Sequence, residues 1–170
     1  MAINNDRRNP YQHWLIIVIV LTIVVLDQVS KYAIRTNFEL YESVTVIVGS
    51  FNLTYIENTG AAFGLLSNVS FPFKTTILAL AATIALLFIA FYMVTLPSSQ
   101  WIARTGLSCI LGGAMGNLID RITTGAVVDF IDLYWRGWHF WAFNVADTAI
   151  TVGVIIMIID LFLTGKHRAS

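Results

Sequence analysis

Charged side chains are scarce in this chain of 170 residues. They make up 12% of it, whereas a soluble domain carries about 25%. Hydrophobic residues make up 57%, and the mean hydropathy is +0.74. Because so few polar groups cannot cover a water-soluble globule, the composition indicates a membrane protein. Ten Lys and Arg balance ten Asp and Glu, and this zero net charge argues against a nucleic-acid partner.

Residues that build disulfides and metal sites are also nearly absent. The single cysteine, Cys109, excludes an internal disulfide, and the chain has no CxxC, no zinc-like Cys/His spacing and no HExxH. Cys109 is best interpreted as a small packing residue. A Ser/His peptidase built on Ser108 and His139 is disfavoured, because Ser108 lies deep in an apolar stretch and His139 in a connection. We therefore expect no metal and no cofactor.

Four apolar stretches are long enough to cross a hydrocarbon core, which takes about 20 residues as a helix. Backbone polar groups in lipid must be hydrogen-bonded within each segment, so these stretches are predicted to be helices. No small-x-small cleavage site follows Leu26, which favours an uncleaved first helix over a signal peptide. We predict an all-α integral membrane fold, a four-transmembrane-helix bundle that forms a single membrane domain over residues 1–170. The predicted spans are about 14–34, 72–96, 101–119 and 145–163.

Four spans place both termini on one side of the membrane and the connections 35–71 and 122–144 on the other. Within the first connection, residues 44–48 are all β-branched, 49–50 form a predicted two-residue turn, and 51–55 alternate between apolar and polar. This pattern predicts a small β-hairpin between the first and second helices. Each side carries five Lys or Arg residues, so the positive-inside rule does not decide the orientation.

The acidic residues are distributed unevenly, since only two of the ten lie near the termini. Asp27, Asp120 and Asp147 each lie near the end of a predicted span on the opposite side. Asp129 lies in the connection between the third and fourth spans. A charged side chain within a span costs a few kcal/mol at the bilayer centre. The sequence therefore predicts a functional layer of carboxylates at one end of the bundle.

The spacing of the polar residues groups them further. Asn117, Asp120 and Arg121 are three and four positions apart, so they share one face of the third helix. Asn144 is expected at or near the N-cap of the fourth helix, where side-chain oxygens are favoured. Asp147 then lies one turn inside that helix. Amide and carboxylate groups from separate spans are thus expected to meet.

Two carboxylates of unlike environment can hydrolyse a peptide without a metal or a nucleophilic side chain. Asp129 lies between Val128 and Phe130, and apolar surroundings raise the pKa of such a carboxyl above about 3.9. If Asp129 and Asp147 face each other, they can share one proton. One acid then activates water while the other protonates the carbonyl or the leaving amine. The residues alone leave Asp120 open as the second acid.

Five short motifs carry these residues in one order along the chain. The motifs are Asp27-Gln28-x-x-Lys31, Asn58-x-Gly60-Ala61-Ala62-Phe63, Gly116-Asn117-x-x-Asp120-Arg121, Gly125-x-Val127-x-Asp129-Phe130 and Phe143-Asn144-x-Ala146-Asp147. Together with the four spans, they resemble the lipoprotein signal peptidases (signal peptidase II), a family of bacterial membrane aspartic peptidases. The resemblance covers about residues 15–163.

The resemblance implies an aspartic endopeptidase with Asp129 and Asp147 as its catalytic dyad. It implies that the substrate is a diacylglyceryl-modified prolipoprotein, cleaved on the N-terminal side of the lipidated cysteine, with no metal involved. The supporting and substrate-binding residues carried over from the motifs are Asp27, Asn58, Gly60, Asn117, Asp120, Arg121 and Asn144.

The resemblance also implies a location and an orientation. It places the chain in the bacterial cytoplasmic (inner) membrane as a multi-pass protein with both termini cytoplasmic and the active site at the periplasmic face. Segments 35–71 and 122–144 are then periplasmic, and the hairpin corresponds to a cradle that lies on the membrane beside the site. The expected partners are the prolipoprotein and membrane lipid, and we expect a monomer.

Other interpretations of the acids stay open at this point. Asp27 can simply pair with Lys31 at i,i+4, and Asp120 with Arg121 as a structural ion pair. Intramembrane acids also mark ion pathways in transporters. Against a transporter, the acids form one layer, and no broken-helix inverted repeat is visible. A non-enzymatic membrane assembly subunit is the third possibility.

Overall fold

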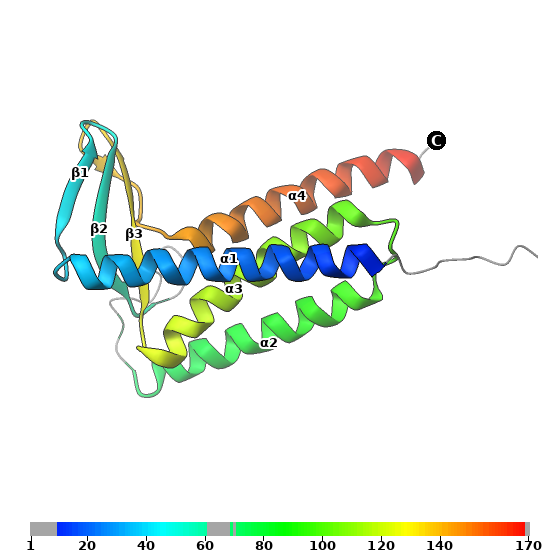
Figure 1. Cartoon of the computed structure of the whole chain (residues 1–170), viewed down its shortest axis with the longest axis horizontal. Helices are drawn as coiled ribbons and strands as arrows, with labels where there is room; N and C mark the ends of the chain where they lie inside the picture. The colour runs from blue at the N-terminus through cyan, green and yellow to red at the C-terminus, as the bar shows by residue number, and fades with distance from the viewer. Residues whose placement is uncertain (1–9, 61–68, 70, 169–170) are drawn as a thin grey trace, which may run out of the picture.

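The computed structural model describes residues 10–60, 69 and 71–168 as four helices and four strands (Figure 1). In chain order the elements are α1 (Pro10–Asn37), β1 (Ser43–Ile47), β2 (Phe51–Asn58), α2 (Lys74–Thr95), α3 (Trp101–Thr123), β3 (Val127–Trp135), β4 (Trp138–His139) and α4 (Val145–Arg168). The helices lie side by side, and the strands gather at one end of them. The beginning of α1 and the end of α4 lie at the opposite end (Figure 1).

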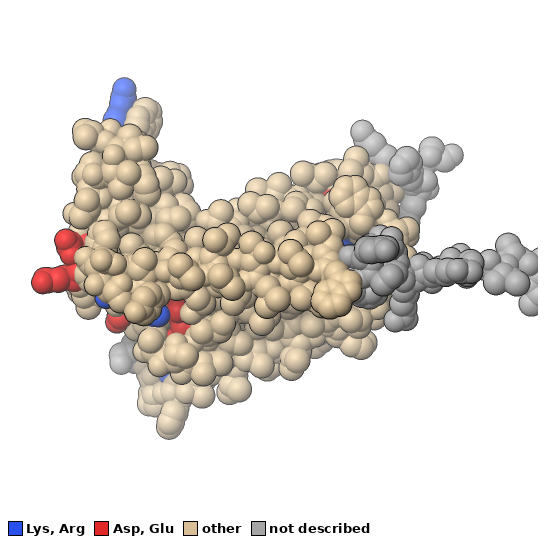
Figure 2. All heavy atoms as spheres, in the orientation of Figure 1, with Lys and Arg blue, Asp and Glu red and all other residues tan. Residues whose placement is uncertain are grey.

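All four helices are long and apolar enough to cross a membrane, with mean hydropathies of 2.1, 2.6, 1.2 and 2.1 along the chain. Their outer faces carry large apolar side chains, such as Phe88 on α2 (70% exposed) and Leu161 on α4 (71% exposed). Apolar surface of this extent is expected against lipid rather than water. Figure 2 shows the helical body almost free of charge and the charged atoms concentrated at the end that carries the sheet. The predicted membrane fold of four helices is confirmed.

The central helix of the bundle is α3. Half of its most apolar window is buried, compared with 11–17% in the other three helices. Glycines allow this close packing: a Cβ added at Gly113 would overlap the carbonyl of Ala146 on α4, and one at Gly112 would press on Ile23 of α1. Small residues at helix contacts in lipid let backbones approach closely. This packing fixes the depth of α1 and α4 relative to α3.

The four strands form one antiparallel sheet in the order β1-β2-β3-β4. The predicted hairpin is present as β1 and β2, but its turn was predicted one residue too short. Ile47 pairs with Phe51, so the turn comprises the three residues 48–50. Gly49 adopts a φ of +85° there, a left-handed conformation that glycine accepts without steric cost. A register shift between Thr45 and Ile47 accompanies the longer turn.

The strand β3 was not predicted. It lies in the connection between α3 and α4 and packs that connection against the bundle. It pairs with β2, where Ile56 lies opposite Asp129 and Asn58 opposite Val127. Its first four residues are buried, and Val128 and Phe130 form a small core with Ile34 of α1. The sheet is thereby packed on the end of the bundle, with Asp129 between the two layers.

Candidate active site

Asp129 and Asp147 reach the site from different elements. Asp129 lies on β3 and is 4% exposed, whereas Asp147 lies in the first turn of α4 and is half-buried. Asn144 directly precedes α4 and fixes that turn, because its Oδ1 accepts from the Asp147 backbone N at 2.9 Å. In return, the Asn144 backbone N donates to Asp147 Oδ2 at 3.3 Å. Such reciprocal bonds satisfy two backbone donors at a helix start.

Asn144 also binds the other acid. Its Nδ2 donates to Asp129 Oδ1 at 2.7 Å and has longer contacts of 3.2 Å with Asn117 Oδ1 and the Val128 carbonyl. The side chain is fully buried, so these bonds have no competition from water. One residue therefore contacts both carboxylates and holds Asp129 and Asp147 next to each other.

Each carboxylate has a second amide donor of its own. Asp147 Oδ1 accepts from Asn117 Nδ2 at 2.8 Å, and Asp129 Oδ2 accepts from Asn58 Nδ2 at 3.0 Å. The donors come from α3 and from the end of β2. Because a carboxylate with two directed donors is fixed in orientation, the site is preorganised before any ligand arrives.

Burial, followed by the negative charge of Asp147, raises the pKa of Asp129 from 3.8 to about 7. Hydrogen bonds from Asn58 and Asn144 and the charge of Lys31 act in the opposite direction. Asp129 is therefore protonated over most of the range below neutral pH. The raised pKa predicted from its apolar neighbours is confirmed.

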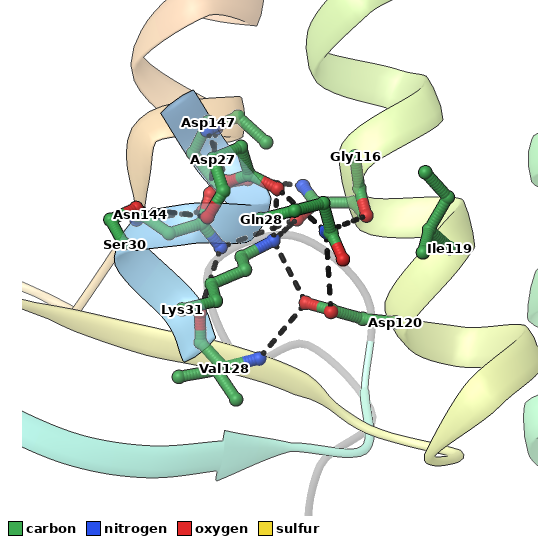
Figure 3. Close-up of polar contacts among 12 residues, drawn as sticks. Asp27, Gln28, Ser30, Lys31, Gly116, Ile119, Asp120, Val128, Asn144 and Asp147 are labelled. Carbon is green, nitrogen blue, oxygen red and sulfur yellow. Dashed lines mark hydrogen bonds and ion pairs between the residues drawn. The ribbon is translucent and has the colours of Figure 1, made fainter. Parts of the chain in front are cut away.

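Lys31 of α1 is the centre of a buried polar cluster next to Asp147 and Asn144 (Figure 3). Its Nζ lies 2.8 Å from Asp27 Oδ2, 2.8 Å from Asp120 Oδ2 and 2.9 Å from Asn117 Oδ1. Lys31 and both carboxylates have no exposed surface. The second oxygen of Asp27 accepts from the backbone N of Ala146 at 2.9 Å. The cluster thus joins α1, α3 and the first turn of α4.

Lys31 also determines which way the Asn117 amide points. An ammonium group can only donate hydrogen bonds, so the amide oxygen of Asn117 must face Lys31. The amide nitrogen then faces Asp147, to which it donates. A charge that does not touch Asp147 thereby orients one of its two hydrogen-bond donors.

The family described as signal peptidase (SPase) II matches residues 19–163, a range that includes every residue of this cluster. The chain belongs to the signal peptidase II family. Proteins named lipoprotein signal peptidase are similar over most of their length. The one from Geobacter sulfurreducens is 42% identical over 89% of this chain and 93% of its own. The one from Symbiobacterium thermophilum is 44% identical over 92% and 99%.

Two solved structures of bacterial membrane enzymes have the same fold as this signal peptidase II family member. One has a TM-score of 0.79 at 35% identity and covers 91% of both chains. The other has a TM-score of 0.74 at 35% identity and covers 86% of this chain and 92% of its own. The family that the five motifs resemble is therefore confirmed by sequence and by structure.

One alternative that the sequence left open for this signal peptidase II family member, an ion pair between Asp120 and Arg121, is wrong. Asp120 does not pair with Arg121; it pairs with Lys31 and, at 3.1 Å, with Arg35. Adjacent helix residues point in different directions, so Asp120 faces α1 while Arg121 faces away from it. Arg121 donates instead to the carbonyl of Gly60 at 3.0 Å. The pair expected between Asp27 and Lys31 is present.

Gly60 connects the end of β2 to this network. Its backbone N donates to Asn58 Oδ1 at 2.8 Å, and its carbonyl accepts from Arg121. The amide of Asn58 therefore contacts Gly60 with its oxygen and Asp129 with its nitrogen. The neighbouring motif residues 61–63 lie outside the described residues.

Three members of the cluster, Gln28, Lys31 and Arg35, were not predicted as site residues, although Gln28 and Lys31 belong to the first of the five motifs. Gln28 donates to the Gly116 carbonyl and to Asp27 Oδ2, both at 3.1 Å. Arg35 was assigned to the first connection because the predicted span ended at 34. The i,i+4 row Asp27, Lys31 and Arg35 marks one face of a longer helix and would have identified it.

The charges of the site balance when the two acids share one proton. Three cations and four carboxylates meet there: Lys31, Arg35, Arg121, Asp27, Asp120, Asp129 and Asp147. An uncompensated charge in a low-dielectric site is costly, so a single proton on the acidic pair gives the neutral state. Among the described residues, no group of three His, Cys, Asp or Glu side chains is placed to hold a metal.

Proposed function

We propose that this chain removes signal peptides from prolipoproteins by aspartic hydrolysis at Asp129 and Asp147. Membership of the signal peptidase II family and relatives named lipoprotein signal peptidases support the reaction. The observation that carries the assignment of the dyad is Asn144, which binds both carboxylates. The two acids are unequal, one almost fully buried and the other half-buried, as general acid and general base require.

In the proposed mechanism, Asp129 holds the resting proton, because it is the more deeply buried acid, and Asp147 is ionised. Asp147 takes a proton from water as the water oxygen attacks the scissile carbonyl. Asp129 gives its proton to the carbonyl oxygen. When the tetrahedral intermediate collapses, Asp147 passes its proton to the leaving amine, and Asp129 recovers its own from the hydroxyl group. One water is consumed, and both acids return to their starting state.

The remaining site residues act through these two acids. Asn117 and Asn144 orient Asp147, while Asn58 and Asn144 orient Asp129. Asp27 and Asp120 hold Lys31, which in turn orients the amide of Asn117. Arg121 and Gly60 secure the chain just after β2 beside the acids. We propose that this last segment borders the bound peptide.

We further propose that the protein lies in the bacterial inner membrane with both termini cytoplasmic and the acids at the periplasmic face. The sheet and the start of α4, which carry Asp129 and Asp147, lie at the end of the bundle opposite the end of α4 and the beginning of α1 (Figure 1). A lipidated signal peptide is already in the bilayer, and its scissile bond lies near the outer interface, at the level of such a site. We propose that the protein acts as a monomer surrounded by membrane lipid.

The substrate class is tested by the lipid on the cysteine. We propose cleavage on the N-terminal side of a diacylglyceryl-modified cysteine, so binding energy from the acyl chains contributes to the transition state. Purified enzyme should cleave the modified prolipoprotein at least about tenfold faster, in kcat/KM, than the same prolipoprotein without lipid. The Asp129→Asn variant is the background control for both substrates. Equal rates for the two substrates would show that the lipid is not recognised.

The pH dependence of cleavage is expected to report the raised pKa of Asp129. Since Asp129 acts in its protonated form, the rate should fall about tenfold per pH unit once the pH exceeds its pKa of about 7. Asn58→Ala removes a hydrogen bond that favours the ionised form. The pKa should then rise, and the alkaline limb of the rate profile should move up by about one pH unit.

The control for this shift is Asn37→Ala, which removes an exposed amide that bonds only within the end of α1. Its profile should coincide with that of the unmodified enzyme. An alkaline limb that stays in place in Asn58→Ala, or moves to lower pH, contradicts the assignment of the limb to Asp129.

A further inference from the structure

Another buried charge, separate from the polar cluster around Lys31, lies at the other end of the bundle. Arg104 is in the first turn of α3 and only 7% exposed. Its one described side-chain hydrogen bond is a long one, from Nη1 to the Leu96 carbonyl at 3.4 Å. Its Nε is buried without any partner. Within the part of the chain that the structure describes, no carboxylate forms an ion pair with Arg104.

An unpaired arginine near a helix end in a membrane usually extends its guanidinium to water along the apolar stem. Arg104 does not do so, since its side chain is covered by the protein. A guanidinium has five N–H donors, and in the described part of the chain only Nη1 has a hydrogen-bond acceptor. An unpaired buried cation in a membrane is costly, so an anion outside the described groups would stabilise Arg104.

The surroundings of Arg104 indicate which kind of anion fits. A hollow of about 20 Å³ opens beside it between α1 and α3, large enough for one water-sized group. The hollow is lined by Leu15, Ile16, Ile19, Trp101, Arg104 and Thr105. A small polar end beside a guanidinium, with an apolar wall leading away from it, matches a phosphate group attached to hydrocarbon chains.

The depth of Arg104 also fits a lipid headgroup. Trp101 begins α3 and is 63% exposed, as expected of an aromatic residue at the membrane interface. Arg104 lies three residues further along, about 4.5 Å deeper at the rise of an α-helix. Basic pockets between helices at this level bind the headgroups of anionic lipids.

We propose that Arg104 binds the phosphate of an anionic phospholipid in the leaflet at the terminal side of the bundle. One phosphate oxygen occupies the hollow and accepts from the guanidinium. The acyl chains run along the α1 surface formed by Leu15, Ile16 and Ile19. This lipid neutralises the buried charge and joins α1 to α3 at the end opposite the acids.

The test uses the full chain in a neutral detergent and follows its thermal unfolding while a ligand is added. The three ligands are dioleoylphosphatidylglycerol, dioleoylphosphatidylcholine and inorganic phosphate. The anionic lipid should stabilise the protein with an apparent Kd at least about tenfold lower than the zwitterionic lipid. Inorganic phosphate should have no effect, because it lacks the chains that contact α1. Stabilisation by inorganic phosphate equal to that by the anionic lipid would identify a small-anion site and overturn the proposal.

Two variants and one control locate the effect. Arg104→Gln should lose the preference for the anionic lipid, and Ile19→Phe should weaken binding by filling the hollow while leaving the charge in place. Arg136→Gln removes a charge at the opposite end of the molecule and should keep the preference. An undiminished preference in Arg104→Gln, or an equal loss in Arg136→Gln, refutes the site. If Arg104→Gln does not fold, Ile19→Phe decides: unchanged binding counts against the proposal.

Discussion

Replacing Asp129 or Asp147 with Asn is expected to lower prolipoprotein cleavage by at least about a thousandfold. An amide has nearly the same shape as a carboxyl group and can keep part of the hydrogen bonding to Asn58, Asn117 and Asn144. It cannot take a proton from water or give one to the carbonyl, and each such proton transfer contributes about 10²–10⁴ in rate. The measurement is the initial rate on a diacylglyceryl-modified prolipoprotein, together with the amount of folded protein recovered from the membrane.

The matched control for this prediction is Asp132→Asn. Asp132 lies on β3, three positions after Asp129, and is also largely buried (9% exposed). It binds Asn52 and His139 of the sheet rather than any residue of the proposed site. Its variant should cleave within a few-fold of the unmodified enzyme. Normal cleavage by both Asp129→Asn and Asp147→Asn would remove the dyad from the mechanism.

The second large effect is expected at Lys31, which forms no described hydrogen bond or ion pair with Asp129 or Asp147. Lys31→Met removes the cation shared by Asp27 and Asp120 and leaves both carboxylates buried. Breaking a buried ion pair by removing one partner costs about 3–5 kcal/mol of unfolding free energy. We expect a correspondingly lower unfolding temperature in detergent and little folded protein in the membrane.

A control variant at another lysine and a double variant test whether the loss comes from the unpaired carboxylates. Lys74→Met removes a lysine at the start of α2 whose described bonds are exposed ones to Thr59 and the Val69 carbonyl. It should change stability by less than about 1 kcal/mol. Asp120 still pairs with Arg35 in Lys31→Met, whereas Asp27 loses its described ion-pair partner. Adding Asp27→Asn to Lys31→Met removes that uncompensated charge and should restore part of the loss. An unfolding temperature of Lys31→Met equal to that of the unmodified protein would show that the cluster is not stabilising.

The four-helix bundle could be predicted from the sequence because the helices must cross a lipid bilayer. A span needs about 20 apolar residues, and four such stretches leave few alternative folds. The concentration of acids at one end was equally visible, since each of three lies near a span boundary. Orientation was not visible, because equal numbers of Lys and Arg flank the two sides.

What the sequence could not separate was Asp129 from Asp120. Both are acids close to the end of the third span, and the difference between them depends on β3. Residues 127–131 are an apolar run with one acid, and such a short run fits either a strand or a buried helical segment. In the structure this run is a strand paired with β2. Asp129 is thereby directed to Asn144, while Asp120 lies on α3 and binds α1.

The position of Arg35 was missed for a related reason. The first span was ended where hydrophobicity falls, at residue 34, but α1 continues to Asn37 because its charged face is buried against α3. Polar residues that pair with one another cost less in a membrane than hydropathy alone assigns them. Span boundaries drawn by hydrophobicity therefore end too early where a helix contributes to a polar cluster.

The two acids belong to separate layers, one to a strand of the sheet and the other to a helix of the bundle. Helix packing alone therefore positions only one acid of the proposed catalytic pair, and docking of the sheet positions the other. If Asp129 and Asp147 are the catalytic dyad, we expect a chain whose four helices are assembled to be inactive until β3 packs onto them. We then expect partial loosening of the contact between β3 and the bundle to abolish hydrolysis while the helices remain packed.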